Sequence, residues 1–210
     1  WCAGHVLRHH LDLDLDIGRT DGVWAPHVPP LARDRSVVIL GLGALGAAVG
    51  TALAGLNFRV SGWSRSAKDI AGIRCLSGEA GLAQALSVAE ILVLLLPLTD
   101  ATRNLMNAER LGSLPQGAVL INPGRGPLLD DKALLAALDA GRLAHATLDV
   151  FREEPLPPDH PFWSHAKVTV TPHIASATRP ESAAKVIAEN VRRGEAGAPF
   201  LHLVDRSLGY

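Results

Sequence analysis

Three short stretches of the sequence carry side chains that could bind and protonate a small anionic substrate. Residues 122–126, Asn-Pro-Gly-Arg-Gly, supply the cation Arg125, and Thr-Pro at 171–172 leads to His173. Between them, residues 149–156, Asp-Val-Phe-Arg-Glu-Glu-Pro-Leu, supply carboxylates. A cation can hold a substrate carboxylate, and a histidine can protonate an oxygen on which negative charge develops. Each residue could instead be structural, as a loop arginine, a helix cap or a buried histidine. Because all three stretches follow apolar runs, their shared position favours a single reaction centre.

Apolar runs alternate with helical patterns from Ser36 to about His173, and these elements must position the three stretches. Strands are expected at 37–40, 58–63, 73–76, 91–96, 118–121, 145–149 and 168–170. Helices are expected near 45–56, 82–89, 107–111 and 130–140, with two more at 1–11 and 180–193, the last stopped by Gly194. Short apolar strands that alternate with helices predict an α/β fold, a doubly wound parallel sheet of the Rossmann type. In such sheets ligands bind at the carboxyl ends of the strands.

One stretch is long enough to raise the possibility of a membrane span. Residues 36–58 contain no charged side chain, but five glycines interrupt them. A strand, a glycine turn and a buried helix explain this run better than a span, and charges flank it without the loop asymmetry of a membrane protein. We therefore expect no membrane association.

Residues 41–46, Gly-Leu-Gly-Ala-Leu-Gly, fit the pattern G-x-G-x-x-G between an apolar strand and an Ala-rich helix. In that context the first glycine permits a tight turn, the second allows the backbone to approach a pyrophosphate, and the third allows close packing of helix on strand. The helix N-terminus offers backbone amides to the anion. The pattern predicts dinucleotide binding at Gly41, Gly43, Ala44, Leu45 and Gly46.

The end of the second strand should decide which dinucleotide binds. An acidic residue there would bind the ribose 2′-hydroxyl of NAD, but the sequence is Trp63 followed by Ser64, Arg65 and Ser66. A guanidinium between two hydroxyls suits a 2′-phosphate. The sequence therefore favours NADP(H), with NAD(H) as a second possibility and a surface arginine as the structural alternative.

Composition excludes several classes of protein. The 210 residues are 48% hydrophobic and 20% charged, which rules out intrinsic disorder. Twenty Lys and Arg against 21 Asp and Glu give a formal charge of −1, so neither a broad nucleic-acid surface nor a polybasic membrane anchor is expected. Two cysteines, Cys2 and Cys75, cannot build a disulfide framework, which favours the cytoplasm.

Two possible metal sites near the start of the chain are rejected. The acids at 12, 14 and 16 resemble the start of a calcium loop, but Ile17 and Val23 stand where such a loop needs Gly and Glu. We interpret them as a solvated acidic face. His5, His9 and His10 have helical spacing without an acidic or cysteine partner, so a surface helix is expected there and no metal.

Together these residues resemble the D-isomer-specific 2-hydroxyacid dehydrogenase family. Its marks are the G-x-G-x-x-G turn, an Asn-x-x-Arg-Gly turn, Asp-Val-Phe-x-x-Glu-Pro-Leu and a Pro-His after the final strand, and all four occur here in order. The NADPH-dependent glyoxylate/hydroxypyruvate reductase branch is most similar, through residues 63–65, 154–158, 178–180 and 209–210. Many members carry Gly-Gly after the histidine, whereas this chain has Ile174-Ala175-Ser176.

The resemblance implies a role for each matching residue. Arg125 would bind the substrate carboxylate and carbonyl, and His173 would protonate the carbonyl oxygen as hydride arrives from the nicotinamide. Glu154 would hydrogen-bond His173 and raise its pKa. Asp149 would meet the nicotinamide end of the cofactor. Pro97 and Thr102 would line the cofactor groove.

The resemblance also implies a domain plan. Residues 1–35 would form an interdomain helix and linker, 36–173 the dinucleotide-binding domain, and 174–210 a return to a substrate domain. On this plan Trp1 is a truncation point, and the chain alone should bind NADPH but reduce 2-oxo acids poorly or not at all. A homodimer paired through the cofactor domain is expected from the resemblance alone.

The sequence leaves one alternative of another class open, a nucleotide-sensing corepressor on the same fold, since corepressors can retain all three reactive residues. A formate dehydrogenase is disfavoured because Glu154 stands where those enzymes carry glutamine, and a phosphoglycerate dehydrogenase would favour an acid near Ser64. The sequence does not rank glyoxylate against hydroxypyruvate or other 2-oxo acids.

Overall fold

The computed structural model describes residues 1–18 and 20–204. The chain forms two compact units, Trp1–Ala175 and Ser176–Tyr210. The predicted resemblance at residues 209–210 lies outside the described residues. The first unit contains the sheet and all of the predicted reactive and cofactor-binding residues.

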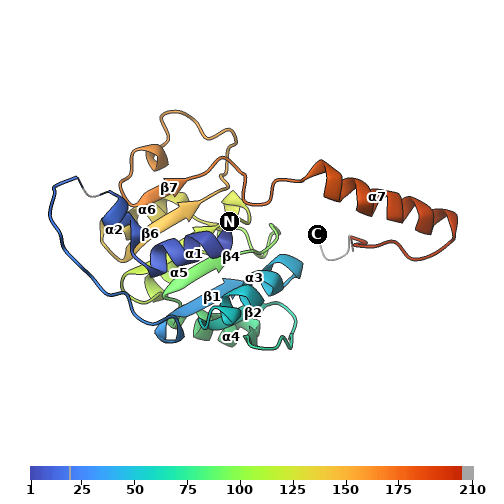
Figure 1. The fold of residues 1–210 in the computed structure, drawn as a ribbon, viewed down its shortest axis with the longest axis horizontal. Helices are drawn as coiled ribbons and strands as arrows, with labels where there is room; N and C mark the ends of the chain where they lie inside the picture. The colour runs from blue at the N-terminus through green and yellow to red at the C-terminus, as the bar shows by residue number, and fades with distance from the viewer. Residues whose placement is uncertain (19, 205–210) are drawn as a thin grey trace. The chain divides into compact units, whose positions relative to one another are not determined.

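Seven parallel strands form one sheet in the order β3-β2-β1-β4-β5-β6-β7 (Figure 1). The strands are β1 (Ser36–Leu40), β2 (Arg59–Ser64), β3 (Arg74–Ser77), β4 (Ile91–Leu94), β5 (Ala118–Asn122), β6 (Leu143–Leu148) and β7 (Val168–Val170). The chain runs outward from β1 to β3, then crosses back to β4 on the other side of β1. At such a reversal of strand order, here between β1 and β4, folds of this type bind ligands at the carboxyl ends of the strands.

In the described part of the chain, two α-helices precede the first strand, four lie between strands and one follows the last strand. They are α1 (Cys2–His10), α2 (Leu13–Ile17), α3 (Ala44–Gly55), α4 (Gly78–Ser87), α5 (Ala108–Ser113), α6 (Asp131–Asp139) and α7 (Pro180–Glu195), with short 3₁₀ turns η1 (Ala32–Asp34), η2 (Gly126–Leu128) and η3 (Pro161–Trp163). Two helices begin at residues suited to cap them. Asn107 accepts the backbone N–H of Arg110, and Asp130 accepts that of Ala133.

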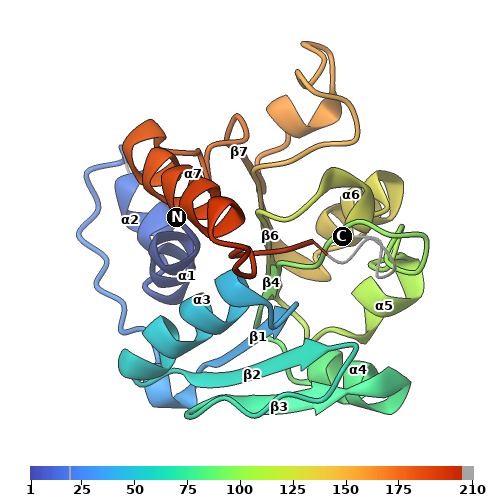
Figure 2. The ribbon, with the colours of Figure 1, turned by 90° about the vertical axis from the view of Figure 1, so that its right-hand side faces the viewer.

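Alternate side chains of the central strands enter two different hydrophobic layers. Val37 and Ile39 of β1 pack with Val6 of α1 and Leu53 of α3, while Val38 and Leu40 pack with the layer that α4, α5 and α6 cover. Figure 2 shows α1 and α3 on one face of the sheet and the other three helices opposite. Both faces of each central strand are thus buried, which explains why their sequences are continuously apolar.

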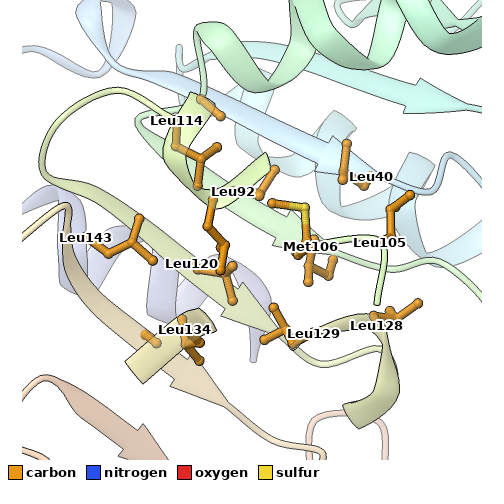
Figure 3. Packing of buried hydrophobic residues seen from close by; sticks show 14 of the residues in the cluster. Leu40, Leu92, Leu105, Met106, Leu114, Leu120, Leu128, Leu129, Leu134 and Leu143 are labelled. Carbon is orange, nitrogen blue, oxygen red and sulfur yellow. The ribbon is translucent and has the colours of Figure 1, made fainter. Parts of the chain in front are cut away.

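The larger layer is built mainly from leucine. Leu92 of β4, Leu120 of β5 and Leu134 of α6 are completely buried and belong to the same cluster as Met106 (Figure 3). A fully buried leucine contributes roughly 2 kcal/mol to stability relative to an exposed one. This layer lies directly beneath the loops that follow β4 and β5, so it supports the residues at the carboxyl edge.

The Rossmann-type fold class is confirmed, and each predicted strand is present with ends shifted by two residues or fewer. The predicted helix 82–89 begins earlier, at Gly78, and the predicted strand 91–96 ends at Leu94. No described helix is long and apolar enough to cross a membrane. The charge-free run at 36–58 forms β1, the glycine turn and α3 instead.

The prediction that Gly194 stops the last helix is wrong. α7 continues to Glu195, and Gly197 ends it with a φ of 65°, a left-handed conformation that glycine adopts without strain. The backbone N–H of Ala198 bonds to the carbonyl of Arg193, and that of Gly197 to the carbonyl of Gly194. These two bonds form a Schellman motif, which satisfies carbonyls that the helix end would otherwise leave unpaired.

The interpretation of the first helix as a surface helix is wrong for two of its histidines. His9 and His10 are only 8% and 6% exposed, because α1 lies against the sheet. The ring of His9 makes a 2.8 Å hydrogen bond to the hydroxyl of Thr147 in β6, and the ring of His10 packs edge-on against Phe58. Among the described residues no group of three His, Cys, Asp or Glu side chains could hold a metal.

Candidate active site at the carboxyl edge of the sheet

The glycine turn after β1 is packed too closely for side chains at two positions. Gly41 has a φ of 109°, and a Cβ there would lie 2.5 Å from the carbonyl oxygen of Leu95. A Cβ at Gly46 would lie 1.8 Å from the carbonyl oxygen of Gly41. These contacts hold the loop after β4 and the start of α3 tightly against the end of β1.

The first turn of α3 is open in front of this packed region. Gly43, Ala44 and Leu45 are exposed, and no side chain caps the helix. A Cβ at Gly43 would meet no heavy atom within 4 Å, so it would project into open space where a ligand could approach. Because the first N–H groups of a helix have no acceptor within it, this end can receive an anion. The arrangement fits the pyrophosphate of a dinucleotide.

The end of β2 lies beside this turn, since the backbone N–H of Gly41 bonds to the carbonyl of Trp63 at 2.8 Å. The hydroxyl of Ser64 is largely buried and donates to the carbonyl of Ser66 at 2.8 Å, which shapes the loop. Arg65 and Ser66 are exposed on that loop. The predicted cofactor-selecting residues therefore lie on the same edge as the glycine turn.

After β4, a threonine closes the loop at the carboxyl edge of the sheet. The hydroxyl of Thr102 donates to the carbonyl of Pro97 at 2.7 Å and accepts the backbone N–H of Thr99 at 2.8 Å. Both Pro97 and Thr102 are half-buried. Thr102 thus fixes the conformation of the loop that contains Pro97, the other residue predicted to line the cofactor groove.

Arg125 extends from a rigid turn after β5. The buried side chain of Asn122 accepts the backbone N–H of Gly124 at 3.1 Å and donates to the carbonyl of Arg125 at 3.0 Å. A Cβ at Gly126 would lie 2.0 Å from the carbonyl carbon of Phe151, so this turn packs directly against the backbone that follows β6. The Arg125 side chain itself is exposed. One guanidinium nitrogen donates to the carbonyl of Gly124 at 2.7 Å, so part of the side chain is tied to the same turn.

Glu154 and His173 form a pair at the next two strand ends. Nδ1 of His173 lies 2.7 Å from Oε2 of Glu154, and Oε1 accepts the backbone N–H of Phe151 at 2.8 Å. The side chain of His173 is 52% exposed and that of Glu154 is 35% exposed. The carboxylate is therefore anchored at one oxygen and orients the imidazole with the other.

Partial burial tends to raise the pKa of Glu154, but hydrogen bonds from His173 and the Phe151 amide outweigh it and lower the pKa below its ordinary value. The positive charges of His173 and Arg125 act in the same direction. Glu154 is therefore ionised at neutral pH and can only accept hydrogen bonds, so Nδ1 of His173 must donate. Nε2 is then the ring nitrogen left to face a substrate.

Asp149 follows β6 and is completely buried. Its Oδ1 accepts the hydroxyl of Thr171 at 2.5 Å and the backbone N–H of Ile174 at 2.9 Å, and its Oδ2 accepts the backbone N–H of Ala175 at 2.8 Å. Neither the Thr171 contact nor the two amide contacts had been predicted. Contacts to backbone amides have no signature in the sequence. The hydroxyl of Thr171, two residues before His173, was the one signal that could have suggested a partner for Asp149.

A cavity of about 440 Å³ opens beside the Glu154–His173 pair. Apart from that pair its lining is apolar, from Phe151, Pro155, Leu156, Trp163, Val170 and Pro172. Trp163 was not among the predicted site residues, because it lies in η3, before β7, and not after the end of a strand. The reactive pair thus has an apolar surface on one side.

Comparison with known proteins adds the family. A family model described as D-isomer specific 2-hydroxyacid dehydrogenase, NAD binding domain, matches residues 5–175. The chain belongs to this family. The dehydrogenase family model thus covers the glycine turn, Arg125, Glu154 and His173.

Curated relatives within the dehydrogenase family carry a reductase name. Glyoxylate/hydroxypyruvate reductase A of Serratia proteamaculans is 44% identical over 211 residues, which cover 100% of this chain and 67% of that protein. The protein of the same name from Yersinia enterocolitica is 41% identical over 206 residues, covering 98% of this chain and 66% of the relative. The chain spans about two thirds of the length of these relatives.

Solved structures of the dehydrogenase family share the fold. A D-isomer specific 2-hydroxyacid dehydrogenase from Xanthobacter autotrophicus, in complex with NADPH and MES, matches with a TM-score of 0.93 and 49% identity, covering 98% of this chain and 85% of that one. The NADPH-dependent glyoxylate/hydroxypyruvate reductase of Sinorhizobium meliloti, in complex with NADP and sulfate, matches with a TM-score of 0.90 and 36% identity. The match covers 100% of this chain and 66% of that one.

Proposed function

We propose that the protein to which this chain belongs reduces small 2-oxo acids, glyoxylate or hydroxypyruvate foremost, to 2-hydroxy acids with NADPH. The observation that carries the proposal is the hydrogen-bonded pair of His173 and Glu154 at the carboxyl edge, on the same edge as Arg125 and the glycine turn. The reductase names of relatives at 41% and 44% identity support the substrate class.

The reaction requires a cation, a proton donor and a hydride source. Arg125 is proposed to bind the substrate carboxylate through its forked guanidinium and to polarise the carbonyl. His173 is proposed to protonate the carbonyl oxygen from Nε2, since Nδ1 donates to Glu154. Glu154 stabilises the protonated imidazole that must exist before the transfer. The nicotinamide cofactor, when bound, supplies the hydride.

The chain offers separate residues for each part of that cofactor. Gly41, Gly43, Ala44, Leu45 and Gly46 are proposed to receive the pyrophosphate at the open end of α3. Pro97 and Thr102 would line the groove after β4, and Asp149 would meet the nicotinamide end. This division agrees with the reversal of strand order between β1 and β4.

A preference for NADPH is proposed from the loop after β2. Ser64, Arg65 and Ser66 supply a guanidinium and hydroxyls without the acid that would bind a free 2′-hydroxyl. Structures of relatives from Xanthobacter autotrophicus and Sinorhizobium meliloti hold NADPH and NADP, respectively, which supports the assignment.

We further propose a domain plan, a homodimer and a cytoplasmic location. Residues 1–35 and 174–210 are proposed to belong with a substrate domain and 36–173 with the cofactor domain. The dimer and the location follow from the family resemblance and the cysteine content. Sedimentation and cell fractionation would test these two points separately from catalysis.

The test is a steady-state panel of 2-oxo acids with the full-length protein, using NADPH and NADH in parallel. We expect oxidation of NADPH with glyoxylate and hydroxypyruvate, and a loss of turnover in His173→Gln. The matched control is His27→Gln, which removes an exposed histidine outside the proposed site. Tight NADPH binding without turnover on any 2-oxo acid would instead favour the nucleotide-sensing module.

A further inference from the structure

The backbone of His173 is held in an unusual conformation. Its φ is 54°, in the left-handed region that side chains other than glycine rarely adopt. A residue stays there only when its surroundings over-determine its position, and such residues cluster at functional sites. The contacts that hold residues 171–175 therefore decide where the imidazole points.

Those contacts converge on the end of β6. The backbone N–H of Thr171 bonds to the carbonyl of Leu148 at 2.9 Å, and that of His173 bonds to the carbonyl of Asp149 at 2.9 Å. The Asp149 carboxylate then takes three more donors from the same loop, namely the Thr171 hydroxyl, the Ile174 amide and the Ala175 amide, at 2.5–2.9 Å. Asp149 thus accepts hydrogen bonds from residues on both sides of His173.

The environment makes these bonds strong and specific. Asp149 is 0% exposed, so water does not compete for its oxygens, and a bond to an ionised acceptor is about twice as strong as a neutral one. None of the salt bridges among the described residues includes Asp149. Its carboxylate oxygens instead accept hydrogen bonds from one hydroxyl and two backbone amides. The carboxylate acts on the loop through hydrogen bonds.

We propose that Asp149 is a positioning residue for the general acid, because its buried carboxylate clamps residues 171–175 and thereby directs Nδ1 of His173 at Glu154. This inference rests on the proposed function for its catalytic meaning. It adds to the predicted contact of Asp149 with the nicotinamide. Oδ1 already accepts two hydrogen bonds and Oδ2 one, which leaves one acceptor position on the carboxylate.

The decisive variant is Thr171→Val, which removes one donor to Asp149 and keeps the side-chain shape. It leaves the Asp149 carboxylate and its two amide donors unchanged, so it separates the proposed clamp from the proposed contact of Asp149 with the cofactor. In the full-length protein we expect kcat to fall about 10- to 100-fold, since a small displacement of a catalytic group has such effects. The dissociation constant for NADPH should change by less than about threefold. Thr171→Ser retains the hydroxyl and should restore most of the lost turnover.

A second measurement reports on the ring directly. Nitrogen chemical shifts of the His173 ring should show Nδ1 protonated and hydrogen-bonded in the wild type. In Thr171→Val, and more so in Asp149→Asn, the signal of that bond should weaken or broaden. Asp149→Asn places an NH₂ group against loop donors, so it could fail to fold, and Thr171→Val keeps the inference testable in that event.

The outcomes separate the inference from the proposed function. Unchanged kcat and unchanged ring signals in Thr171→Val would overturn the clamp. The clamp would also be overturned if turnover returned to the wild-type value at saturating NADPH, because the loss would then come from weaker cofactor binding alone. If the wild type reduced no 2-oxo acid but its His173 signals still responded to Thr171→Val, the proposed function would fail while the clamp remained. A loss of turnover with altered ring signals and retained NADPH binding supports both.

Discussion

The carboxylate of Glu154 lies 2.7 Å from Nδ1 of His173 while its second oxygen is bound to a backbone amide. An acceptor anchored in this way fixes the hydrogen on Nδ1 and leaves Nε2 for proton transfer. The pair is only partly buried, so a substrate could reach it. Its chemistry leads to the first prediction.

Replacing Glu154 by glutamine should lower kcat/KM for 2-oxo acid reduction about 10- to 100-fold. The amide keeps the shape but lacks the negative charge that stabilises a protonated imidazole. The alkaline limb of the pH–rate profile should therefore move towards lower pH. Because the pKa of Glu154 is lowered, its carboxylate stays ionised at neutral pH in the wild type. The negative charge is lost only when the pH falls below the ordinary pKa of a glutamate. A glutamine variant with the wild-type profile would contradict the role.

Replacing Arg125 by alanine should reduce turnover at least about a thousandfold, because the substrate carboxylate loses its cation. Binding of NADPH, measured by fluorescence titration, should change little. The control is Arg74→Ala, which removes an exposed cation from the opposite edge of the sheet at the start of β3. Wild-type rates with Arg125→Ala would remove this residue from the site.

Replacing Arg65 by alanine should weaken NADPH binding by about 10- to 100-fold and NADH binding by much less. The physical reason is that a guanidinium contact with the 2′-phosphate is available only in NADPH, and a charge-assisted bond is worth about 1.5–3 kcal/mol. Arg74→Ala again serves as the control. Equal losses for both cofactors would show that Arg65 does not read the phosphate.

Alanine at Gly126 should destabilise the protein by about 1–3 kcal/mol, because its Cβ would overlap the backbone of Phe151. The matched control is Gly112→Ala in α5. A Cβ there meets nothing within 4 Å, so alanine should stabilise the helix by about 0.5–1 kcal/mol. Urea unfolding of the two variants checks both signs. Equal effects would contradict the close approach of the two loops.

The free energy of unfolding should fall as pH decreases from about 6.5 towards 3. Burial, with the charges of His145 and Arg8, lowers the pKa of His9 to about 3, and burial lowers that of His145 to about 4. Both groups are neutral in the fold and protonate first in the unfolded chain, so stability is complete above the unfolded pKa and lost below it. The slope cannot exceed about 1.4 kcal/mol per pH unit for each group.

His9→Gln should flatten this acid dependence while lowering stability at neutral pH, since the bond to Thr147 is buried. His27→Gln, at an exposed position, is the control. Urea unfolding at several pH values gives the comparison. An unchanged slope in His9→Gln would mean that other groups govern acid stability.

Most elements could be predicted because their apolar runs are buried on both faces of one sheet. β1 is the clearest case, with Val37, Val38, Ile39 and Leu40 all completely buried. The early start of α4 was missed because Gly78 and Gly81 are poor helix formers, whereas the helix is stabilised by the burial of Leu82, Ala85 and Leu86.

The site could be predicted only in part, for a related reason. Arg125, Glu154 and His173 were predicted to share one edge because each follows a strand, and parallel strands end at one edge. The burial of His9 and His10 depends on α1 covering the sheet, which a helical spacing alone does not reveal. The loop bonds of Asp149 depend on backbone amides, which every residue but proline shares.

The residues proposed to select the cofactor lie outside both hydrophobic layers. Arg65 and Ser66 are exposed beyond β2, whereas the turn that carries Arg125 is locked against the backbone at Phe151. Surface substitutions usually change stability by less than about 0.5 kcal/mol, whereas overpacking costs more. A change in the proposed cofactor-selecting loop should therefore cost little folding stability, whereas a bulkier residue at Gly126 would disturb the packing that fixes the Arg125 turn.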